Sequence, residues 1–321
     1  MSIVEALDPG SCPVPGSAAD RPGQDAPGRL PRLALRDGPL RVPATMSGMS
    51  ASAQGFPQRI VCLTEETTET LYLLGEEDRI VGISGFTVRP ARARKEKPRV
   101  SAFTSAKLDR ILALQPDLVL GFSDLQADIA AQLARAGLDV HLFNQRSVAE
   151  IFRMIRTLGG MIGCEARTAE LVTRLEDGVE SARRRAAALP RRPRVYFEEW
   201  DEPLISAIRW VSELMGIAGG EDCFPELSVQ PLGRQRIIAD ALEVPRRAPD
   251  IIFGSWCGKK FRPEERAARP GWSTIPAVRS GFVREIKSAI ILQPGPAALT
   301  DGLEALQDII EEWSTSPAAR E

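Results

Sequence analysis

Two acidic runs stand where they could contact a ligand. Glu65 and Glu66 follow the apolar run Arg59–Leu63, and EEWDEPL (Glu198–Leu204) belongs to the end of a second apolar run. A helix N-terminus stabilises negative charge by about 0.3–1 kcal/mol. Paired carboxylates can perform general acid–base catalysis or meet a cationic or metal-bearing ligand. Because no separate nucleophile or base accompanies them, binding is favoured over catalysis, with a solvated surface turn as the alternative for each run.

The run SWCGKKF (Ser255–Phe261) carries an unusual thiol. Neighbouring lysines, Lys259 and Lys260, could lower the pKa of Cys257, and a thiolate could then ligate a metal or corrin cobalt. The alternative is a buried thiol beside the aromatic wall formed by Trp256. The flanking glycines of a phosphate-binding loop are missing.

Aromatic residues end two similar apolar runs, PDLVLGF and PDIIFGSW, in Phe122 and Trp256. Open α/β sheets bind ligands beyond the carboxyl ends of their strands, so both residues are predicted ligand walls. Other candidate ligand contacts at predicted strand ends and turns are Phe86, Arg89, Phe103, Thr104, Asp124, Gln145, Arg146, Glu199, Trp200, Lys259, Arg269 and Trp272. We assign no catalytic residue and no metal ligand among them.

Strand-like and helix-like runs must position these residues. Short apolar runs alternate with helical periodicity up to residue 144, a long helical stretch ends before Pro190, and a second alternating series starts at Arg194. This alternation predicts an α/β fold with two doubly wound lobes, mostly parallel sheets and one long rigid connecting helix. The expected parts are a disordered or untranslated Pro-rich segment over 1–55, a lobe over 56–160, the helix over 161–190 and a lobe over 191–315.

Composition limits the class of partner. With 41 Lys and Arg against 43 Asp and Glu, the net charge of −2 argues against nucleic acid binding. The 5 cysteines stand singly, without the spacing of a zinc site or a disulfide framework. Neither a secretory signal nor an apolar run of about 20 residues is visible, so we expect a cytoplasmic monomer without membrane insertion, or a periplasmic protein if the start hides a signal.

Several sequence segments, in their order along the chain, resemble the substrate-binding proteins of vitamin B12 and iron-siderophore ABC importers, particularly the cobalamin-binding branch. The resemblance extends over about residues 57–313. They are RIVCLTEETTETLYLLGEEDRIVGISGF, LDRILALQPDLVLGFSD, the connecting helix, and IAGGEDCFPE before the second PDII run. The resemblance implies two lobes bridged by a rigid helix, with a non-covalently bound solute in the cleft. It also implies that Asp109 docks on a permease arginine and that Phe86 contacts the ligand.

Three functional hypotheses remain open. The leading one is binding of cobalamin or another corrinoid or metal chelate, without catalysis and without a required cofactor. The second is an enzyme or metallochaperone that uses Cys257 with Glu198, Glu199 or Asp201. The third is the substrate-binding component of a B12 or iron-siderophore importer, which would engage a permease only if the chain is exported.

Overall fold

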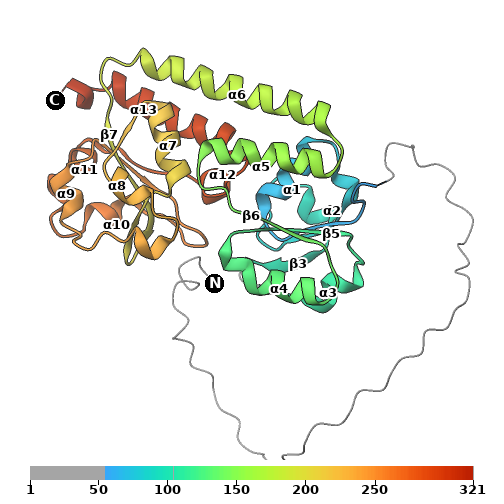
Figure 1. Ribbon diagram of the computed structural model, residues 1–321. Coiled ribbons are helices and arrows are strands. Elements are labelled where there is room, and N and C mark those ends of the chain that lie inside the picture. The colour runs from blue at the N-terminus through green and yellow to red at the C-terminus, as the bar shows by residue number, and fades with distance from the viewer. Residues whose placement is uncertain (1–54, 104, 321) are drawn as a thin grey trace, which may run out of the picture. The chain divides into compact units, whose positions relative to one another are not determined.

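The structure is a computed structural model that describes residues 55–103 and 105–320. Thr104 and residues 1–54 of the predicted N-terminal segment therefore lie outside the described residues. Within them the chain forms two sheets, one before and one after a long helix, and each sheet is packed against helices (Figure 1). The predicted α/β class, with two lobes and mostly parallel sheets, is confirmed. The exact lobe boundaries stay predictions.

The sheet of the first lobe has the order β4-β3-β2-β1-β5-β6 among the described residues, and only the β3–β4 pair is antiparallel. Its strands are β1 (Ile60–Cys62), β2 (Ile80–Ser84), β3 (Arg99–Ala102), β4 (Ser105–Ala106), β5 (Leu118–Phe122) and β6 (Val140–Phe143). Its helices are α1 (Glu65–Leu73), α2 (Ala93–Glu96), α3 (Leu108–Ala113), α4 (Ala127–Arg135) and α5 (Val148–Met161).

Strand β1 shows why the apolar runs become central strands. Ile60 and Cys62 pack in one core cluster, while Val61 packs in another on the opposite face, and all three are fully buried. Successive side chains of a strand point to opposite faces of the sheet. A strand covered by helices on both faces must therefore be apolar throughout, as this run is.

The aspartates of the two Pro-Asp pairs make equivalent hydrogen bonds in both lobes. Asp117, just before β5, accepts hydrogen bonds from the Arg59 N–H at 2.8 Å and the Gln58 N–H at 2.7 Å. Asp250, just before β10 (Ile251–Gly254), accepts one from the Arg194 N–H at 2.8 Å. Each carboxylate thus ties its strand to the start of the neighbouring parallel strand, β1 or β7 (Arg194–Asp201), where a backbone donor needs a partner.

The sheet of the second lobe has the order β11-β10-β7-β8, and β9 also pairs with β7. Its strands are β7 (Arg194–Asp201), β8 (Leu204–Ser206), β9 (Glu221–Asp222), β10 (Ile251–Gly254) and β11 (Val283–Glu285). Its helices are α7 (Arg209–Ala218), α8 (Pro225–Ser228), α9 (Glu243–Arg247), α10 (Pro263–Ala267), α11 (Pro276–Ser280), α12 (Ser288–Ile291) and α13 (Leu303–Thr315), preceded by a π-helical turn, η7 (Ala298–Gly302). Strand β7 runs through Asp201 because it pairs with β8 in an antiparallel hairpin.

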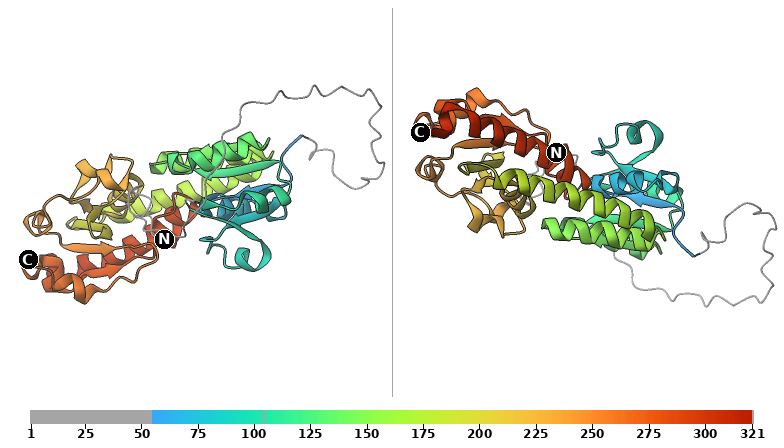
Figure 2. Two further views of the ribbon diagram at one scale, coloured as in Figure 1. Left: turned by 90° about the horizontal axis from the view of Figure 1, so that it is seen from below. Right: turned by 90° about the horizontal axis from the view of Figure 1, so that it is seen from above.

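The connecting helix α6 (Glu165–Ala187) has 23 residues, which gives it a length of about 35 Å. It contacts α5 of the first lobe and α7 and α13 of the second (Figures 1 and 2). A Cβ atom at Gly159 of α5 would lie 1.9 Å from Thr168 Oγ1, so only glycine permits this close packing of α5 on α6. No described helix combines the length and apolar character needed to cross a membrane.

Candidate functional site

The lobe junction, as we name it, is the contact of residues 294–301 of the second lobe with the first lobe. Gln145, just after β6, donates from Nε2 to the Pro294 carbonyl at 3.0 Å. The Ala297 N–H donates to Glu69 Oε2 of α1, also at 3.0 Å. The junction therefore brings the second lobe against segments that follow β1 and β6.

Arg89 belongs to the lobe junction. Its Nε lies 2.9 Å from Glu69 Oε1, and its Nη1 lies 2.7 Å from Asp301 Oδ2 of the second lobe. In this structure the guanidinium of Arg89 is held between two carboxylates from different lobes, and its role as a polar ligand anchor stays a prediction.

The glutamates at the start of α1 are buried. Glu65 is 8% exposed and Glu66 is 1% exposed, so a solvated turn is excluded. Thr64 Oγ1 donates to Glu66 Oε1 at 2.7 Å. Burial raises the pKa of Glu65 to about 7 and that of Glu66 to about 8. A Cβ atom at Gly295 would lie 2.5 Å from Glu66 Cβ, so the lobe junction closes directly over Glu66.

Cys257 is a poor nucleophile in this setting. Burial raises the pKa of its thiol to about 11, and the nearby charges of Glu199 and Glu65 add to the rise. The predicted activation by neighbouring lysines is wrong, because Lys259 Nζ lies 2.6 Å from Asp201 Oδ2 instead. Cys257 does, however, lie near Glu65 of the first lobe and Glu199 of the second.

Arg146 follows β6, is partly buried, and has incomplete pairing of its charge. Its guanidinium carbon lies 4.8 Å from the centre of the Phe122 ring. Its Nη2 lies 3.4 Å from Asp124 Oδ1, and its buried Nε has no hydrogen-bond partner among the described residues. Glu199 and Arg236 of the second lobe both act on the pKa of Arg146, which places the two lobes within electrostatic reach here.

The pair of Arg236 and Glu199 is the main feature that sequence reasoning missed. Arg236 Nη1 lies 2.6 Å from Glu199 Oε2, and Nη2 lies 2.9 Å from Oε1. Arg236 is 1% exposed, and its Nε has no partner among the described residues. Nothing in the local run RQRII around Arg236 signals this role, because its partner comes from a distant strand.

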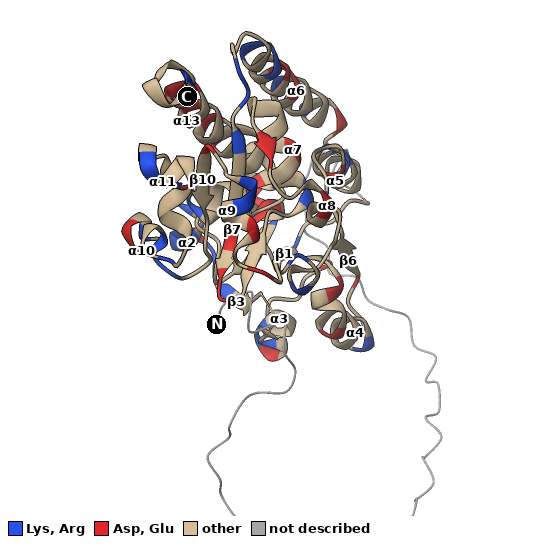
Figure 3. Cartoon of the chain, turned by 90° about the vertical axis from the view of Figure 1, so that its left-hand side faces the viewer, with Lys and Arg blue, Asp and Glu red and all other residues tan. Residues whose placement is uncertain are grey.

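Acidic residues lie along β7 (Figure 3). Arg269 and Lys259, two predicted ligand contacts, form ion pairs with acids of this strand. Arg269 pairs through both Nη atoms with Glu198, with Nη2 3.1 Å from Oε1. Asp201 accepts from Lys259 and, at 3.1 Å, from Arg266. In this structure the two cations serve as partners of buried carboxylates, and their contact with a ligand stays a prediction.

Two of the predicted tryptophan walls lie inside the second lobe. Trp272 is 1% exposed and packs edge-on against Tyr196, with ring centres 6.1 Å apart. Trp256 is 4% exposed, with Arg266 and Lys259 over its ring. The prediction that Trp256 and Trp272 form walls of a ligand site is wrong, because both rings are buried inside the second lobe. Trp200 is half-buried, and its indole N–H donates to the Glu202 carbonyl at 3.0 Å.

The remaining predicted residues of the first lobe are spread over its surface and strand ends. Gln126 donates to the Phe103 carbonyl at 2.8 Å and accepts from the Phe122 N–H at 2.9 Å, so it joins the ends of β3 and β5. Phe86, in the loop after β2, is 47% exposed. Asp109 lies exposed on α3, away from these contacts.

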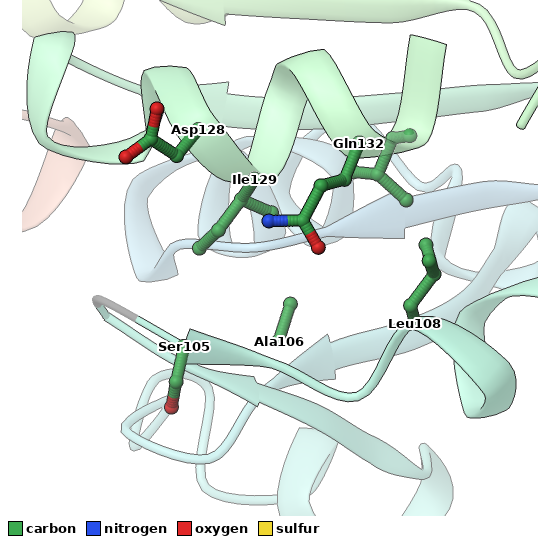
Figure 4. Close-up of a pocket in the computed structure, with 7 residues that line it drawn as sticks. Ser105, Ala106, Leu108, Asp128, Ile129 and Gln132 are labelled. Atoms are coloured by element: carbon green, nitrogen blue, oxygen red, sulfur yellow. The ribbon is translucent and has the colours of Figure 1, made fainter. Parts of the chain in front are cut away.

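Two cavities in the structure are lined by residues outside the lobe junction. One, of about 270 Å³, lies between β4, the start of α3, and α4, with Ala106, Leu108, Ile129 and Gln132 facing it (Figure 4). The other, of about 490 Å³, is a groove between α5, α6 and α7. No predicted ligand residue among those described lines either cavity. Direct contacts link Arg146 with Phe122 and Asp124, and longer-range electrostatic effects link Arg146 with Glu199 and Arg236, and Cys257 with Glu65 and Glu199.

Two α/β lobes, one long bridging helix, and charged side chains from both lobes meeting at strand ends define the class of helix-linked solute-binding proteins. The chain belongs to the family described as periplasmic binding protein, which matches residues 60–290.

Proteins similar in sequence or fold to this chain are also described as binding proteins. An uncharacterized ABC transporter substrate-binding lipoprotein of Bacillus subtilis is 25% identical over 82% of this chain and 83% of its own length. A vitamin B12-binding protein of Vibrio parahaemolyticus is 22% identical over 78% of this chain and 88% of its own. A periplasmic heme-binding protein from Pseudomonas aeruginosa shares the fold, with a TM-score of 0.68, 21% identity, and coverage of 79% of this chain and 93% of that structure.

These descriptions bear on the compartment. The Bacillus subtilis relative is a lipoprotein and the family is that of periplasmic binding proteins, which favours the periplasmic alternative over the cytoplasmic location expected from the sequence. The Bacillus subtilis relative is described as the substrate-binding lipoprotein of an ABC transporter.

Proposed function

We propose that this protein binds a corrinoid such as cobalamin between its lobes and hands it on without chemical change. The observation that carries the proposal is that Arg146 of the first lobe lies within electrostatic reach of Glu199 and Arg236 of the second, in a family whose members include vitamin B12-binding proteins. Glu65 and Glu66 add carboxyl groups close to the same place. Such groups can hydrogen-bond the amide side chains of a corrin ring, as donors when protonated and as acceptors when charged.

The state of the candidate chemical groups argues against catalysis. The raised pKa of Cys257 keeps its thiol protonated near neutral pH. Glu198 and Glu199 each hold an arginine in a two-point ion pair, which leaves neither free as a general base. The alternative of a Cys257-based enzyme or metallochaperone is therefore the weaker one.

We further propose that the protein works outside the cytoplasm with an ABC permease. Asp109 lies on α3, which precedes the Pro-Asp pair and β5, and the same order of helix, Pro-Asp pair and strand recurs in α9 and β10. Glu243 begins α9, and its side chain is 37% exposed. We therefore assign Glu243 as the counterpart of Asp109 on the second lobe.

The binding proposal is tested by absorbance titration of the full chain with cobalamin, cobinamide and haem. Saturable binding of cobalamin or cobinamide is the expected result. If neither corrinoid binds, the corrinoid proposal is wrong. Binding of haem alone would keep the solute-binding class and change the ligand.

The partner proposal is tested by copurification with the permease encoded in the same cell, together with cell fractionation. The change of Asp109→Lys with Glu243→Lys should abolish copurification while ligand affinity stays the same, because neither residue is among the junction contacts described above. Arg110→Glu, a charge change on the same helix as Asp109, serves as the control. Recovery of the protein only in the cytoplasmic fraction would contradict the proposal.

A further inference from the structure

Arg146 is a buried cation whose pairing is incomplete. Its side chain is 16% exposed, and its contact with Asp124, at 3.4 Å, is too long for a strong charge-assisted hydrogen bond. The Asp124 side chain is itself 62% exposed, so solvent weakens the pair further. The buried Nε of Arg146 has no partner among the described residues, and burial lowers the pKa of the guanidinium.

The other buried arginines near the site show what complete pairing looks like in this protein. Arg236 and Arg269 each direct both Nη atoms to one carboxylate, those of Glu199 and Glu198. Arg146 is held in place without such a partner by stacking on Phe122. Because proteins rarely keep a buried charge unpaired, an under-compensated guanidinium at a strand end is a feature that a ligand can satisfy.

Three carboxylates, those of Asp124, Glu150 and Glu199, act on Arg146 as opposite charges. Arg236 of the second lobe acts on Arg146 as a like charge, and its own buried Nε also lacks a partner among the described residues. Each of the two guanidinium groups therefore has a buried Nε–H without a partner among the described residues. Glu150 accepts the backbone N–H of Arg146 at 2.7 Å and pairs with Arg153, and Glu199 pairs with Arg236. The exposed Asp124 is the carboxylate that pairs with the Arg146 guanidinium, and a ligand anion would compete with it there.

We propose that Arg146 binds an anionic oxygen group of the ligand through Nε and Nη2, and so selects chelates that carry one. A carboxylate or a phosphate matches the side of a guanidinium by two parallel hydrogen bonds. The proposal rests on the proposed function for the place of binding and adds the chemical class of the ligand. The anion is either the phosphodiester of a nucleotide-bearing corrinoid or the carboxylate of a haem.

The test uses ligand pairs that differ in the anionic group. Cobalamin is compared with cobinamide, which lacks the phosphodiester, and haem with its dimethyl ester, which lacks the free carboxylates. Each is titrated into the full wild-type chain and into Arg146→Gln, Arg146→Lys and Asp124→Asn. Arg153→Gln, an exposed arginine of α5 with a side chain 70% exposed, controls for the loss of one positive charge.

The anionic member of the pair that binds should lose about tenfold or more in affinity in Arg146→Gln, as expected for a charge-assisted hydrogen-bond pair, and less in Arg146→Lys. Its anion-free analogue should change less than about twofold. Asp124→Asn should tighten anionic ligands, because it removes a competing acceptor, and Arg153→Gln should change neither ligand.

Arg146→Gln should also fold with unchanged or higher thermal stability, because it removes an under-compensated buried charge. The proposal is overturned if both members of a ligand pair lose affinity equally in Arg146→Gln, or if neither does, while the wild type binds. If no chelate binds the wild type, the proposed function itself fails, and the proposal about Arg146 fails with it.

Discussion

Arg89 and Asp301 form an ion pair that joins the two lobes, with Nη1 2.7 Å from Oδ2. The same guanidinium lies 2.9 Å, through Nε, from Glu69 Oε1, and Glu69 in turn accepts the N–H of Ala297. A single arginine of the first lobe thus holds the buried Glu69 and the π-helical turn of the second lobe together.

Replacing Arg89 by Leu should lower the free energy of unfolding by about 1–3 kcal/mol, because Glu69 loses a charged partner while it stays buried. Thermal or urea unfolding measures the change. Arg92→Leu is the matched control, since Arg92 pairs with Glu77 within the first lobe and its side chain is 53% exposed. The control should change stability by less than about 1 kcal/mol. Equal effects of the two changes would show that the bridge between lobes adds nothing.

The buried Glu65 and Glu66 should make the free energy of unfolding depend on pH. Both have a pKa raised from 4.5, to about 7 and about 8, so the folded chain binds protons more tightly than the unfolded chain. Stability contributed by these groups is fully present below pH 4.5 and declines as pH rises through 7 and 8. This direction is opposite to that of an ion-paired carboxylate.

Unfolding free energies measured between about pH 5 and 9 should therefore show a smaller decline in Glu65→Gln and Glu66→Gln than in the wild type. The amides stay neutral over the whole range. Glu170→Gln, an exposed change on α6, is the control and should follow the wild type. Parallel profiles for all four proteins would contradict the burial of charged carboxyls at the start of α1.

Cys257 should react slowly with iodoacetamide in the folded protein. With a pKa of about 11, only about one thiol in a thousand is ionised at pH 8, and the thiolate is the reactive form. Mass spectrometry of the peptide gives the rate, compared with the same peptide in denaturant. Cys257→Ala should keep ligand binding. Fast folded-state labelling, or loss of function in the variant, would revive the enzyme or metallochaperone hypothesis.

The pair of Arg236 and Glu199 should behave as a buried unit. Arg236→Met leaves the Glu199 carboxylate without its two-point partner, and the expected loss is about 3–5 kcal/mol of unfolding free energy. Adding Glu199→Gln should restore part of that loss, since no uncompensated charge then remains. Urea unfolding of the two single variants and the double variant completes the cycle, and strictly additive effects would show that the pair is not coupled.

Much of the fold follows from local patterns in the sequence. Apolar runs such as Arg59–Leu63 predict strands because both faces of a parallel sheet are buried, and the long run before Pro190 predicts the connecting helix. The recurring Pro-Asp pairs mark the start of a strand in both lobes, whereas the hydrogen bonds of Asp117 and Asp250 to neighbouring strands became visible only in the structure. The strands and the connecting helix depend on residues close in sequence or on the periodicity of one element, so the sequence alone determines them.

The tertiary structure alone decided how the charged and aromatic residues are used. Arg236 meets Glu199 and Arg89 meets Asp301 only after distant segments pack together, and no local run contains the second partner. Trp272 stands in a turn-like run yet lies in the core, because what covers it comes from other elements. Burial, which depends on the whole fold, sets the protonation of Cys257 where its neighbouring lysines predicted the reverse.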